Sequence, residues 1–416
     1  MKICITSYRG NMYSGGQGIY LYYLTRELAE LGHDVTVLVG PPYPAEMPWA
    51  RVIKIPNQNF YAVKKDWLPK PNPLEIFRPL NLFEFASTRF WFFPEMLAFS
   101  VRAYNRLARM FRDGERFDVI HDNQCLGWGH VLMKSFGPPV VASIHHPLGM
   151  DRAADFEQTQ GLIERARRIV FYPFIMQQAV ARHMDLWISG SRDSADAVAD
   201  TFKLDRNKMR VIYDGVDDNV FTQKNGDEKI PGRLIFVGNT EDRKKGILYL
   251  MEALSSLPPE VNLLVVDGCS KWKFFANELI EKYRLQGRVE FLARIPPEDL
   301  AQEYRKAEVA VVPSVYEGFG LPAAEAMACG TPVVSSDGGA LPEVVGHDGD
   351  GIIVPAKDSK ALARSVKRLL DSPDLRKSMG ERGHRRVMEM FTWRKMTEGT
   401  VEVYKEAIER KRHAYR

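Results

Sequence analysis

The sequence predicts an α/β protein built from two doubly wound domains, and three observations lead to this prediction. Its 416 residues exceed what one hydrophobic core usually covers. The first forty residues read strand, glycine-rich loop, amphipathic helix and strand, which is a parallel β-α-β unit. Short valine- and isoleucine-rich strands recur after residue 232 with helical patterns between them, so a second domain repeats the design.

The strands fall into two series joined by a polar segment. In a first domain, residues 1–216, strands are expected at residues 2–8, 34–40, 117–121, 139–145, 185–190 and 209–215. In a second domain, residues 232–393, they are expected at residues 233–239, 262–268, 288–294, 309–314, 331–336 and 350–354. Residues 217–231 form the linker. A helix at about 394–416 either packs back on the first domain, packs across both domains or frays in solvent.

Composition argues against several classes of protein. The net charge of +4 is too small and too dispersed to predict nucleic-acid binding. The cysteines form no C-x-x-C pair, so neither a zinc site nor a disulfide framework is expected; they are Cys4, Cys125, Cys269 and Cys329. Met1 runs directly into a strand, with no apolar stretch long enough for a signal peptide or a membrane span. A cytoplasmic protein is therefore expected.

A glycine-rich turn follows the first strand and contains Gly15, Gly16 and Gly18. It lacks the third glycine of a dinucleotide fingerprint, and the second strand ends without the acidic residue that would hold a ribose. NAD binding is therefore not expected. The turn is either an ordinary turn or a backbone surface close to a substrate.

Two glutamates flank a second glycine-rich turn, EGFGLPAAEA, which follows a buried strand at residues 307–312. Pro322 suits the first turn of a helix, so a helix is expected to begin near Leu321. Free N–H groups at such a helix start attract an anion such as phosphate. Glu317 and Glu325 would repel phosphate, so each is expected to accept hydrogen bonds from neutral hydroxyls, such as those of a sugar and a ribose.

Three stretches of the chain carry a family resemblance. FVGNTEDRKKG (residues 236–246), residues 291–345 and VIYDGVDDNVF (residues 211–221) resemble the family 4 retaining glycosyltransferases of the GT-B architecture. The resemblance runs from the first strand to the C-terminal helix and is weakest at about residues 50–115. It implies two Rossmann-like domains facing across a cleft, a nucleotide diphosphate sugar as donor, and neither a metal nor another cofactor.

The resemblance also implies roles for residues of the second domain. Glu325 would bind the ribose hydroxyls of the donor, and Glu317 would lie against the donor sugar. Lys245 would neutralise the diphosphate, a task that suits a compact ammonium charge. The backbone amides that would face the sugar or its phosphate belong to Phe319, Gly320 and Leu321.

One position departs from the family. Arginine commonly follows the glycine that corresponds to Gly238, but here the residue is Asn239, which cannot neutralise phosphate. Arg243 is expected to supply the missing charge if its loop folds back. Asp214 stands where asparagine is common, a change expected to affect a turn rather than catalysis.

Other candidate residues are a histidine and a loop arginine. His145 ends the expected strand at residues 139–145 and matches a family histidine that contacts the donor sugar. Arg294 corresponds to a loop that borders the nucleotide base, where the backbone is expected to matter more than the side chain. His121, His130 and His146 lack ligand spacing and carboxylate neighbours, so structural roles are expected for them. The acidic triplet at residues 348–350 is interpreted as a turn rather than as a metal site.

The implied reaction transfers a sugar to an acceptor hydroxyl with retention at the anomeric carbon. The implied partners are a UDP- or GDP-sugar and an acceptor sugar or lipid-linked glycan. Three alternatives stay open: a nucleotide-sugar epimerase of the same architecture, a non-catalytic binder of nucleotide sugars, and a glycoside hydrolase with two carboxylates. Donor base, linkage and oligomeric state are not specified by the sequence.

An aromatic cluster at residues 90–93 precedes a segment with evenly spaced arginines. They lie 4, 3, 3 and 4 residues apart and form one stripe of a helix; they are Arg102, Arg106, Arg109, Arg112 and Arg116. The favoured interpretation is that the apolar side of this helix packs on the first domain. The alternative is that the helix lies peripherally on an anionic membrane, near a hydrophobic acceptor.

Overall fold

The computed structural model describes residues 1–11, 16–57, 73–89, 93–145, 174–224, 226, 228–268, 274–293, 295–347 and 349–414. The chain forms two compact units. Unit 1 comprises Met1–Gly190, Ala195–Ile212 and Thr397–Arg416, and unit 2 comprises Ser191–Ser194 and Tyr213–Met396. The predicted linker, residues 217–231, lies within unit 2.

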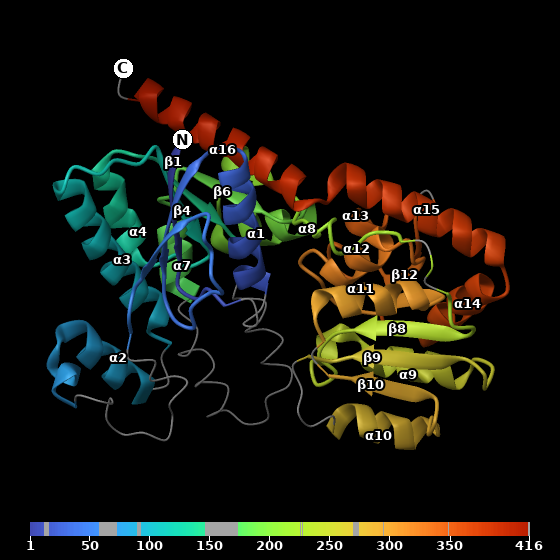
Figure 1. Ribbon diagram of the computed structural model, residues 1–416. Coiled ribbons are helices and arrows are strands. Elements are labelled where there is room, and N and C mark those ends of the chain that lie inside the picture. Colours follow the sequence, from blue (N-terminus) through green and yellow to red (C-terminus); the bar gives the residue numbers. More distant parts are fainter. Residues whose placement is uncertain are drawn as a thin grey trace. The chain divides into compact units, whose positions relative to one another are not determined.

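Unit 1 contains a parallel sheet of seven strands among its described residues (Figure 1). The strands are β1 (Lys2–Ser7), β2 (Asp34–Val39), β3 (Arg51–Lys54), β4 (Val119–Asn123), β5 (Val140–Ser143), β6 (Leu186–Ser189) and β7 (Met209–Val211), in the spatial order β3-β2-β1-β4-β5-β6-β7. The six predicted strands are confirmed, with ends that differ by a few residues. The sequence analysis missed β3, because a short strand with a charged residue at each end lacks an apolar run.

The described helices that lie in unit 1 are α1 (Gly16–Glu30), η1 (Pro73–Phe77), α2 (Pro79–Arg89), α3 (Glu95–Arg112), α4 (Trp128–Met133), η2 (Lys134–Phe136), α7 (Phe174–Ala181) and η3 (Arg206–Lys208). Two more, α8 (Arg192–Phe202) and α16 (Trp393–Ala414), begin with residues of unit 2 and continue in unit 1. Helix α1 begins earlier than predicted, so Gly16 and Gly18 occupy its first turn rather than a loop. Gly15 lies outside the described residues.

Helix α3 packs its apolar side into the core of unit 1, as the favoured interpretation predicts. Phe99, Leu107 and Met110 are buried there. The predicted arginine stripe is not uniform, because Arg102 pairs with the buried Glu84 at 2.5 Å, whereas several of the other arginines are exposed. Among the described residues, no helix is both long and apolar enough to cross a bilayer.

The C-terminal helix α16 is firmly packed for much of its length. Tyr404 is fully buried, and its hydroxyl lies 2.5 Å from Nδ1 of His121 on strand β4. Val403 and Ala407 are buried on the same helix. The alternative in which this segment frays in solvent is therefore wrong for the described residues.

Unit 2 contains a second parallel sheet with the same winding. Its described strands are β8 (Arg233–Val237), β9 (Asn262–Val266), β10 (Val289–Leu292), β11 (Val309–Val312), β12 (Val333–Ser336) and β13 (Ile352–Val354), in the order β10-β9-β8-β11-β12-β13. All six correspond to predicted strands. In both units the first strand is central and the winding reverses beside it, as in dinucleotide-binding folds.

Two hydrophobic clusters cover the two faces of this second sheet. Ile235 and Ala310 belong to one cluster, while their neighbours Leu234 and Val309 belong to the other. The alternation follows from the two-residue repeat of a strand. The helices are η4 (Arg243–Lys245), α9 (Ile247–Ser255), α10 (Phe274–Tyr283), α11 (Pro297–Lys306), α12 (Leu321–Ala328), α13 (Leu341–Val345), α14 (Ser359–Leu370) and α15 (Pro373–Met390).

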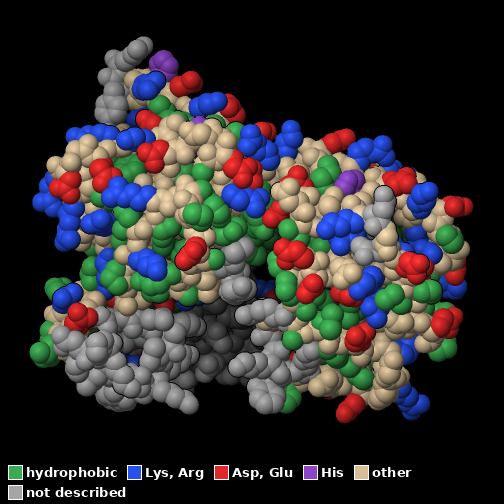
Figure 2. Space-filling model, in the orientation of Figure 1, with side chains coloured by type: hydrophobic (Ala, Val, Ile, Leu, Met, Phe, Trp, Pro, Cys, Tyr) green, Lys and Arg blue, Asp and Glu red, His purple; other side chains and the backbone are tan. Residues whose placement is uncertain are grey.

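Charged side chains of both signs are scattered over the visible surface of unit 2 (Figure 2). On the face drawn in Figure 2, lysine and arginine side chains are interspersed with aspartate and glutamate over its described residues. Such a mixture agrees with the small net charge of the whole chain.

Candidate active site

The candidate site of unit 2 lies where the winding of its sheet reverses. Strands β8 and β11 are neighbours and run parallel, so the loops that follow them leave the same edge of the sheet. Lys245 lies in the loop after β8, and Glu317 lies in the loop after β11. Ligands of open parallel sheets bind at this position.

Helix α12 starts at this edge, at Leu321, as predicted. Its N-cap residue Gly320 has φ +104°, a conformation that favours glycine, and a Cβ there would lie 2.7 Å from the side chain of Leu341. Pro322 occupies the first turn. Among the described residues, the N–H groups of Phe319 and Gly320 donate no hydrogen bond, so they remain available to an anion.

Glu317 and Lys245 form a charge pair at the start of this helix. The ammonium nitrogen lies 2.8 Å from Oε1 of Glu317 and 3.0 Å from Oε2. The hydroxyl of Ser314 also donates to Oε1, at 2.8 Å. The side chain of Glu317 is 10% exposed and that of Lys245 is 28% exposed, so the pair is partly shielded from water. The sequence predicted both residues, but not their contact or Ser314.

Backbone contacts hold Lys245 in this place. The carboxylate of Asp242 accepts a hydrogen bond from the N–H of Lys244 and so caps the N-terminus of the short helix η4. The carbonyl of Lys244 accepts from the N–H of Val315, at 2.7 Å. Gly246 has φ +72°, and a Cβ there would lie 2.0 Å from the carbonyl oxygen of Pro313. Only glycine lets these two loops approach so closely.

Glu325 lies one turn into α12, as predicted, and is held by a tyrosine. The hydroxyl of Tyr304, on α11, donates to Oε2 of Glu325 at 3.1 Å. Burial raises the pKa of Glu325 to about 7, and the hydrogen bond from Tyr304 lowers it in part. The protonated form of Glu325 is therefore much more favoured near neutral pH than it is for an exposed glutamate. Tyr304 was not predicted, since an ordinary amphipathic helix gives no signal that a tyrosine meets a glutamate of another helix.

Other predicted residues of unit 2 do not join the charge pair. The guanidinium of Arg243 lies over the ring of Phe275, 5.1 Å from its centroid. The side chain of Asn239 accepts from the N–H of Glu241 at 3.0 Å, which stabilises the loop after β8. Gly238 donates its N–H to the carbonyl of Val266. No described contact links these three residues to Glu317 or Glu325.

Two further observations correct or extend the sequence analysis. Phe319 is buried in the core, with its ring against Phe391, so only its backbone can face a ligand. Asp214 does not lie in a turn: it precedes the bridge between Val216 and Thr392. Its Oδ1 is buried without a partner among the described residues, and burial raises its pKa to about 7.

Two serines of unit 2 hold the carbonyl next to Glu317. The hydroxyls of Ser191 and Ser194 donate to the carbonyl of Gly318, at 2.7 Å and 3.0 Å. The carboxylate of Glu343 accepts from the N–H groups of Arg192 and Asp193. No pattern in the sequence joins these serines to residue 318, more than 120 residues later.

In unit 1, His145 follows strand β5 and is held by residues of neighbouring elements. Its Nε2 lies 3.0 Å from Oδ1 of Asn123, and its N–H donates to Oε1 of Gln124 at 2.8 Å. Its ring also meets the ring of Tyr20, with centroids 4.6 Å apart. Arg294 and His146 lie outside the described residues, as does Asp348 of the acidic triplet.

The expectation for His130 needs a correction, because this histidine does have a carboxylate neighbour. Asp122 Oδ1 lies 3.3 Å from its Nε2, and Cys125 lies close enough that the three could share an ion. All three are buried and already bonded: Cys125 donates to the carbonyl of Met96, and Thr6 contacts Nε2 of His130. Burial also raises the pKa of Cys125 and disfavours the thiolate that a metal needs. The cluster therefore stabilises the loop after β4.

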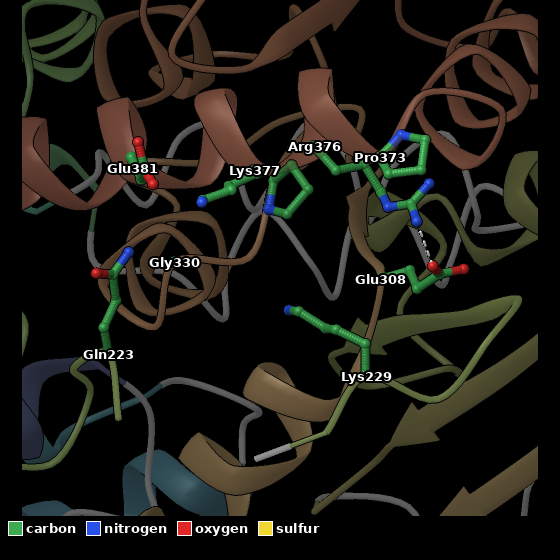
Figure 3. Close-up of a pocket in the computed structure, with 9 residues that line it drawn as sticks. Gln223, Lys229, Glu308, Gly330, Pro373, Arg376, Lys377 and Glu381 are labelled. Atoms are coloured by element: carbon green, nitrogen blue, oxygen red, sulfur yellow. Dashed lines mark hydrogen bonds and ion pairs between the residues drawn. The ribbon is translucent and has the colours of Figure 1, made fainter. Parts of the chain in front are cut away.

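A pocket of about 360 Å³ also opens on unit 2, at the opposite ends of the strands (Figure 3). Glu308, just before β11, accepts a hydrogen bond from Arg376 at 2.6 Å within it. Lys229 donates to the carbonyl of Ala307, the residue before Glu308. These contacts link the amino ends of the strands to α15. The pocket is separate from the charge pair of Lys245 and Glu317.

Comparison with known proteins identifies the family. Residues 217–386 match the family described as glycosyl transferases group 1, and residues 14–220 match glycosyltransferase family 4. A protein of Mycolicibacterium hassiacum named MMP alpha-(1->4)-mannosyltransferase is 39% identical over 420 residues, covering 99% of each chain. The chain belongs to the family 4 glycosyltransferases.

Solved structures of other glycosyltransferases share the fold of this family 4 member. Sucrose-phosphate synthase from Thermosynechococcus elongatus has a TM-score of 0.72 at 26% identity, with 97% of this chain and 98% of that chain covered. HepE of Anabaena, solved with UDP and glucose, has a TM-score of 0.71 at 19% identity, with 97% and 99% covered. The protein therefore has the GT-B fold, with two Rossmann-like domains.

Proposed function

We propose that this family 4 glycosyltransferase moves a hexosyl group from a nucleoside diphosphate sugar to a saccharide hydroxyl, with retention at the anomeric carbon. The observation that carries the proposal is the pair of Lys245 and Glu317 at the N-terminus of α12, where the winding of the second sheet reverses. A positive charge and free N–H groups at this edge suit a diphosphate, and a carboxylate beside them suits sugar hydroxyls.

Each residue of the site then has a task in this reaction. Lys245 and the N–H groups at the start of α12 stabilise the diphosphate as negative charge develops on it. Glu317 accepts hydrogen bonds from the donor sugar, and Glu325 accepts from the ribose. His145 acts on the sugar from unit 1. Arg243 and the backbone near Arg294 and Asn239 are proposed to border the donor, on the family resemblance alone.

The proposed reaction needs no nucleophile from the enzyme. The bond between the anomeric carbon and the diphosphate oxygen breaks, and the acceptor oxygen bonds to the same face of that carbon. The acceptor proton passes to a phosphate oxygen of the leaving group. No metal is proposed, because Lys245 and α12 supply positive charge at the position of the diphosphate.

The relatives narrow the choice of sugar. The name of the Mycolicibacterium hassiacum protein records an α-(1→4) mannosyl transfer, so mannose is proposed as the donor sugar here and a saccharide as acceptor. UDP or GDP is proposed as the carrier; HepE of Anabaena was solved with UDP, at an identity that supports only the fold. An α product is the one that retention yields from an α-linked sugar nucleotide.

A further proposal concerns where the protein acts: it attaches peripherally to an anionic membrane, near its acceptor. Arg109, Arg112 and Arg116 are exposed on one side of unit 1 and would meet anionic head groups. Co-sedimentation with vesicles of anionic and of zwitterionic lipid at low salt tests this. Binding to the anionic vesicles alone is expected, and protein that stays in the supernatant would favour an acceptor free of the membrane.

Product analysis tests the function as a whole. Purified protein is incubated with GDP-mannose or UDP-sugars, with and without short mannosides, and the anomeric configuration of the product is read by proton NMR. Donor consumption that requires acceptor, and an α product, are expected. Conversion of donor without acceptor would indicate an epimerase instead, and binding of donor without any turnover would indicate a non-catalytic protein.

A further inference from the structure

His145 lies at the carboxyl edge of the first sheet, one strand beyond the point where the winding reverses between β1 and β4. Strand β4 pairs with β1 on one side and with β5 on the other, so the carboxyl ends of all three strands leave the sheet together. Ser7 ends β1, Asn123 ends β4, and His145 follows β5 by two residues. This edge corresponds to the edge that carries Lys245 and Glu317 in unit 2.

The loop after β4 contains strained backbone, and this strained bend positions a hydrogen-bond partner of His145. Gln124 has φ +52° and Leu126 has φ +48°, conformations that cost non-glycine residues free energy. The carboxylate of Asp122 holds this bend by accepting from the N–H groups of Cys125 and Leu126, at 3.1 Å and 2.7 Å. The bend aims the buried side chain of Gln124 at the N–H of His145.

The amide of Asn123 has only one orientation that satisfies its neighbours. Its Nδ2 lies 3.1 Å from the carbonyl oxygen of Gln17, and a carbonyl can only accept. The same Nδ2 lies 3.2 Å from Oγ of Ser7, whose own proton is donated to the carbonyl of Arg9. Nitrogen therefore occupies this side of the amide, and Oδ1 must face His145.

This orientation decides which ring nitrogen of His145 bears a proton. Oδ1 of Asn123 only accepts, and it lies 3.0 Å from Nε2 of His145. Nε2 must therefore donate, so the neutral imidazole is the Nε2–H tautomer. Asn123 is fully buried, so bulk water does not compete for its Oδ1.

A second set of contacts limits how the ring can turn. The rings of Tyr20 and His145 form a T-shaped contact with an interplanar angle of 73°, and the Tyr20 hydroxyl lies 2.9 Å from Oγ of Ser143. Ser143 in turn lies 2.8 Å from Nε2 of His121. Burial, with a smaller contribution from His145, lowers the pKa of His121 to about 3, so this neighbour stays uncharged near neutral pH.

We propose that Asn123 is a positioning residue that holds His145 as the Nε2–H tautomer, so that the imidazole acts on the donor through Nδ1. The assignment of Nδ1 to the donor rests on the proposed function, whereas the tautomer does not. Such outer partners commonly fix the tautomer of a working histidine.

The tautomer is measured directly, without any substrate. In protein labelled with ¹⁵N-histidine, long-range ¹H–¹⁵N spectra distinguish the two neutral tautomers, and the signals lost in His145→Gln are those of His145. The Nε2–H form is expected in the wild type, and a mixture of tautomers in Asn123→Ala. An Nδ1–H form in the wild type, or an unchanged tautomer in folded Asn123→Ala, would overturn the proposal.

Kinetics then separate a positioning role from a merely structural one. We expect Asn123→Ala to lower kcat at least tenfold with a smaller change in KM. Asn123→Asp keeps an acceptor for Nε2–H and adds a charge that favours imidazolium, so the acidic limb of the pH profile is expected to move to higher pH. The control is Asn262→Ala in unit 2, whose side-chain amide donates to the carbonyl of Glu260 and has no other described hydrogen bond.

The outcomes also separate this inference from the proposed function. If no sugar nucleotide is turned over while the Nε2–H tautomer depends on Asn123, the function fails and the tautomer assignment stands. If the transferase works and its pH profile is the same in Asn123→Asp, the positioning role is wrong. Thermal unfolding of each variant shows whether it remains folded during the measurements.

Discussion

Lys245 and Glu317 are 72 residues apart in the chain, yet they form the charge pair at the centre of the candidate site. Without a ligand, the ammonium group serves both carboxylate oxygens. A bound diphosphate would compete for this ammonium group, and the hydroxyls of the sugar would replace it on the carboxylate. In the proposed reaction, the pair would therefore keep these two charges compensated until the donor binds.

Replacement of Lys245 by methionine tests this pair. Lys245→Met leaves Glu317 with only Ser314 as a described side-chain partner, so we expect a loss of stability of about 1–3 kcal/mol and a large loss of turnover. The double variant Lys245→Met/Glu317→Gln is expected to regain stability but not turnover, measured by thermal unfolding and donor consumption. Lys360→Met, on the exposed surface of α14, serves as control. Turnover by the double variant at the wild-type rate would contradict both roles.

The raised pKa of Glu325 predicts a pH dependence of donor binding. Its ordinary pKa of 4.5 is raised to about 7 by burial, so the carboxylate becomes protonated as the pH falls below 7. A protonated carboxyl accepts hydrogen bonds from ribose hydroxyls less well. Donor affinity, measured by calorimetry between pH 5.5 and 8.5, is therefore expected to fall toward acid. In Glu325→Gln the affinity should be weaker and flat across this range, and a slope equal to the wild type's would assign the titration to another group.

At the scale of elements, the close approach of the loops after β8 and β11 depends on a glycine, Gly246. Gly287, in another turn, serves as the comparison. Gly246 and Gly287 have nearly the same φ, +72° and +77°. A Cβ at Gly246 would lie 2.0 Å from the carbonyl oxygen of Pro313, whereas one at Gly287 meets nothing within 4 Å. An alanine at either position would have to adopt a positive φ, but only an alanine at Gly246 would also collide with the carbonyl oxygen of Pro313.

This matched pair yields a prediction. Gly287→Ala is expected to lose about 1–2 kcal/mol, the cost of the left-handed conformation, with turnover unchanged. Gly246→Ala is expected to lose more, because the loop of Lys245 must move away from Pro313, and to lose turnover as well. Urea unfolding and donor consumption measure both effects. Equal losses of stability in the two variants would mean that the approach of the two loops is unimportant.

Elements were easier to predict than contacts. The strands and the start of α12 could be predicted from local sequence patterns. These are the valine runs, a glycine just before the helix and Pro322 in its first turn. The contact of Lys245 with Glu317 depends on β8 and β11 being neighbours, and that follows from the winding of the whole sheet. The serines on Gly318 and the amide of Asn123 depend on tertiary positions that leave no mark in the local sequence.

At the scale of the whole molecule, one buried carboxylate is expected to make stability depend on pH. Asp214 has an ordinary pKa of 3.8 that burial raises to about 7. The folded state therefore holds a proton that the unfolded state releases, so this residue lowers stability progressively as the pH rises from about 4 to about 7. Asp214→Asn is expected to raise the unfolding temperature at pH 8 and to leave it nearly unchanged at pH 4. A shift of the same size at both values would assign the effect to packing instead.

In both sheets the candidate residues lie at the carboxyl edge: Lys245 and Glu317 follow the two strands between which the winding of unit 2 reverses, and His145 lies one strand beyond the reversal in unit 1. In unit 2, positive charge at this edge comes from Lys245 and from the start of α12, which makes a divalent ion dispensable in the proposed reaction.

Donor binding should then stabilise the fold without metal. A sugar nucleotide at 100 times its dissociation constant is expected to stabilise the protein by about 2.7 kcal/mol, seen as a higher unfolding temperature. We expect GDP-mannose or a UDP-sugar to give this shift equally with EDTA and with magnesium, and Glu325→Ala to reduce it. A shift that EDTA abolishes and magnesium or manganese restores would mean that a metal ion, and not the charges of this chain alone, holds the diphosphate.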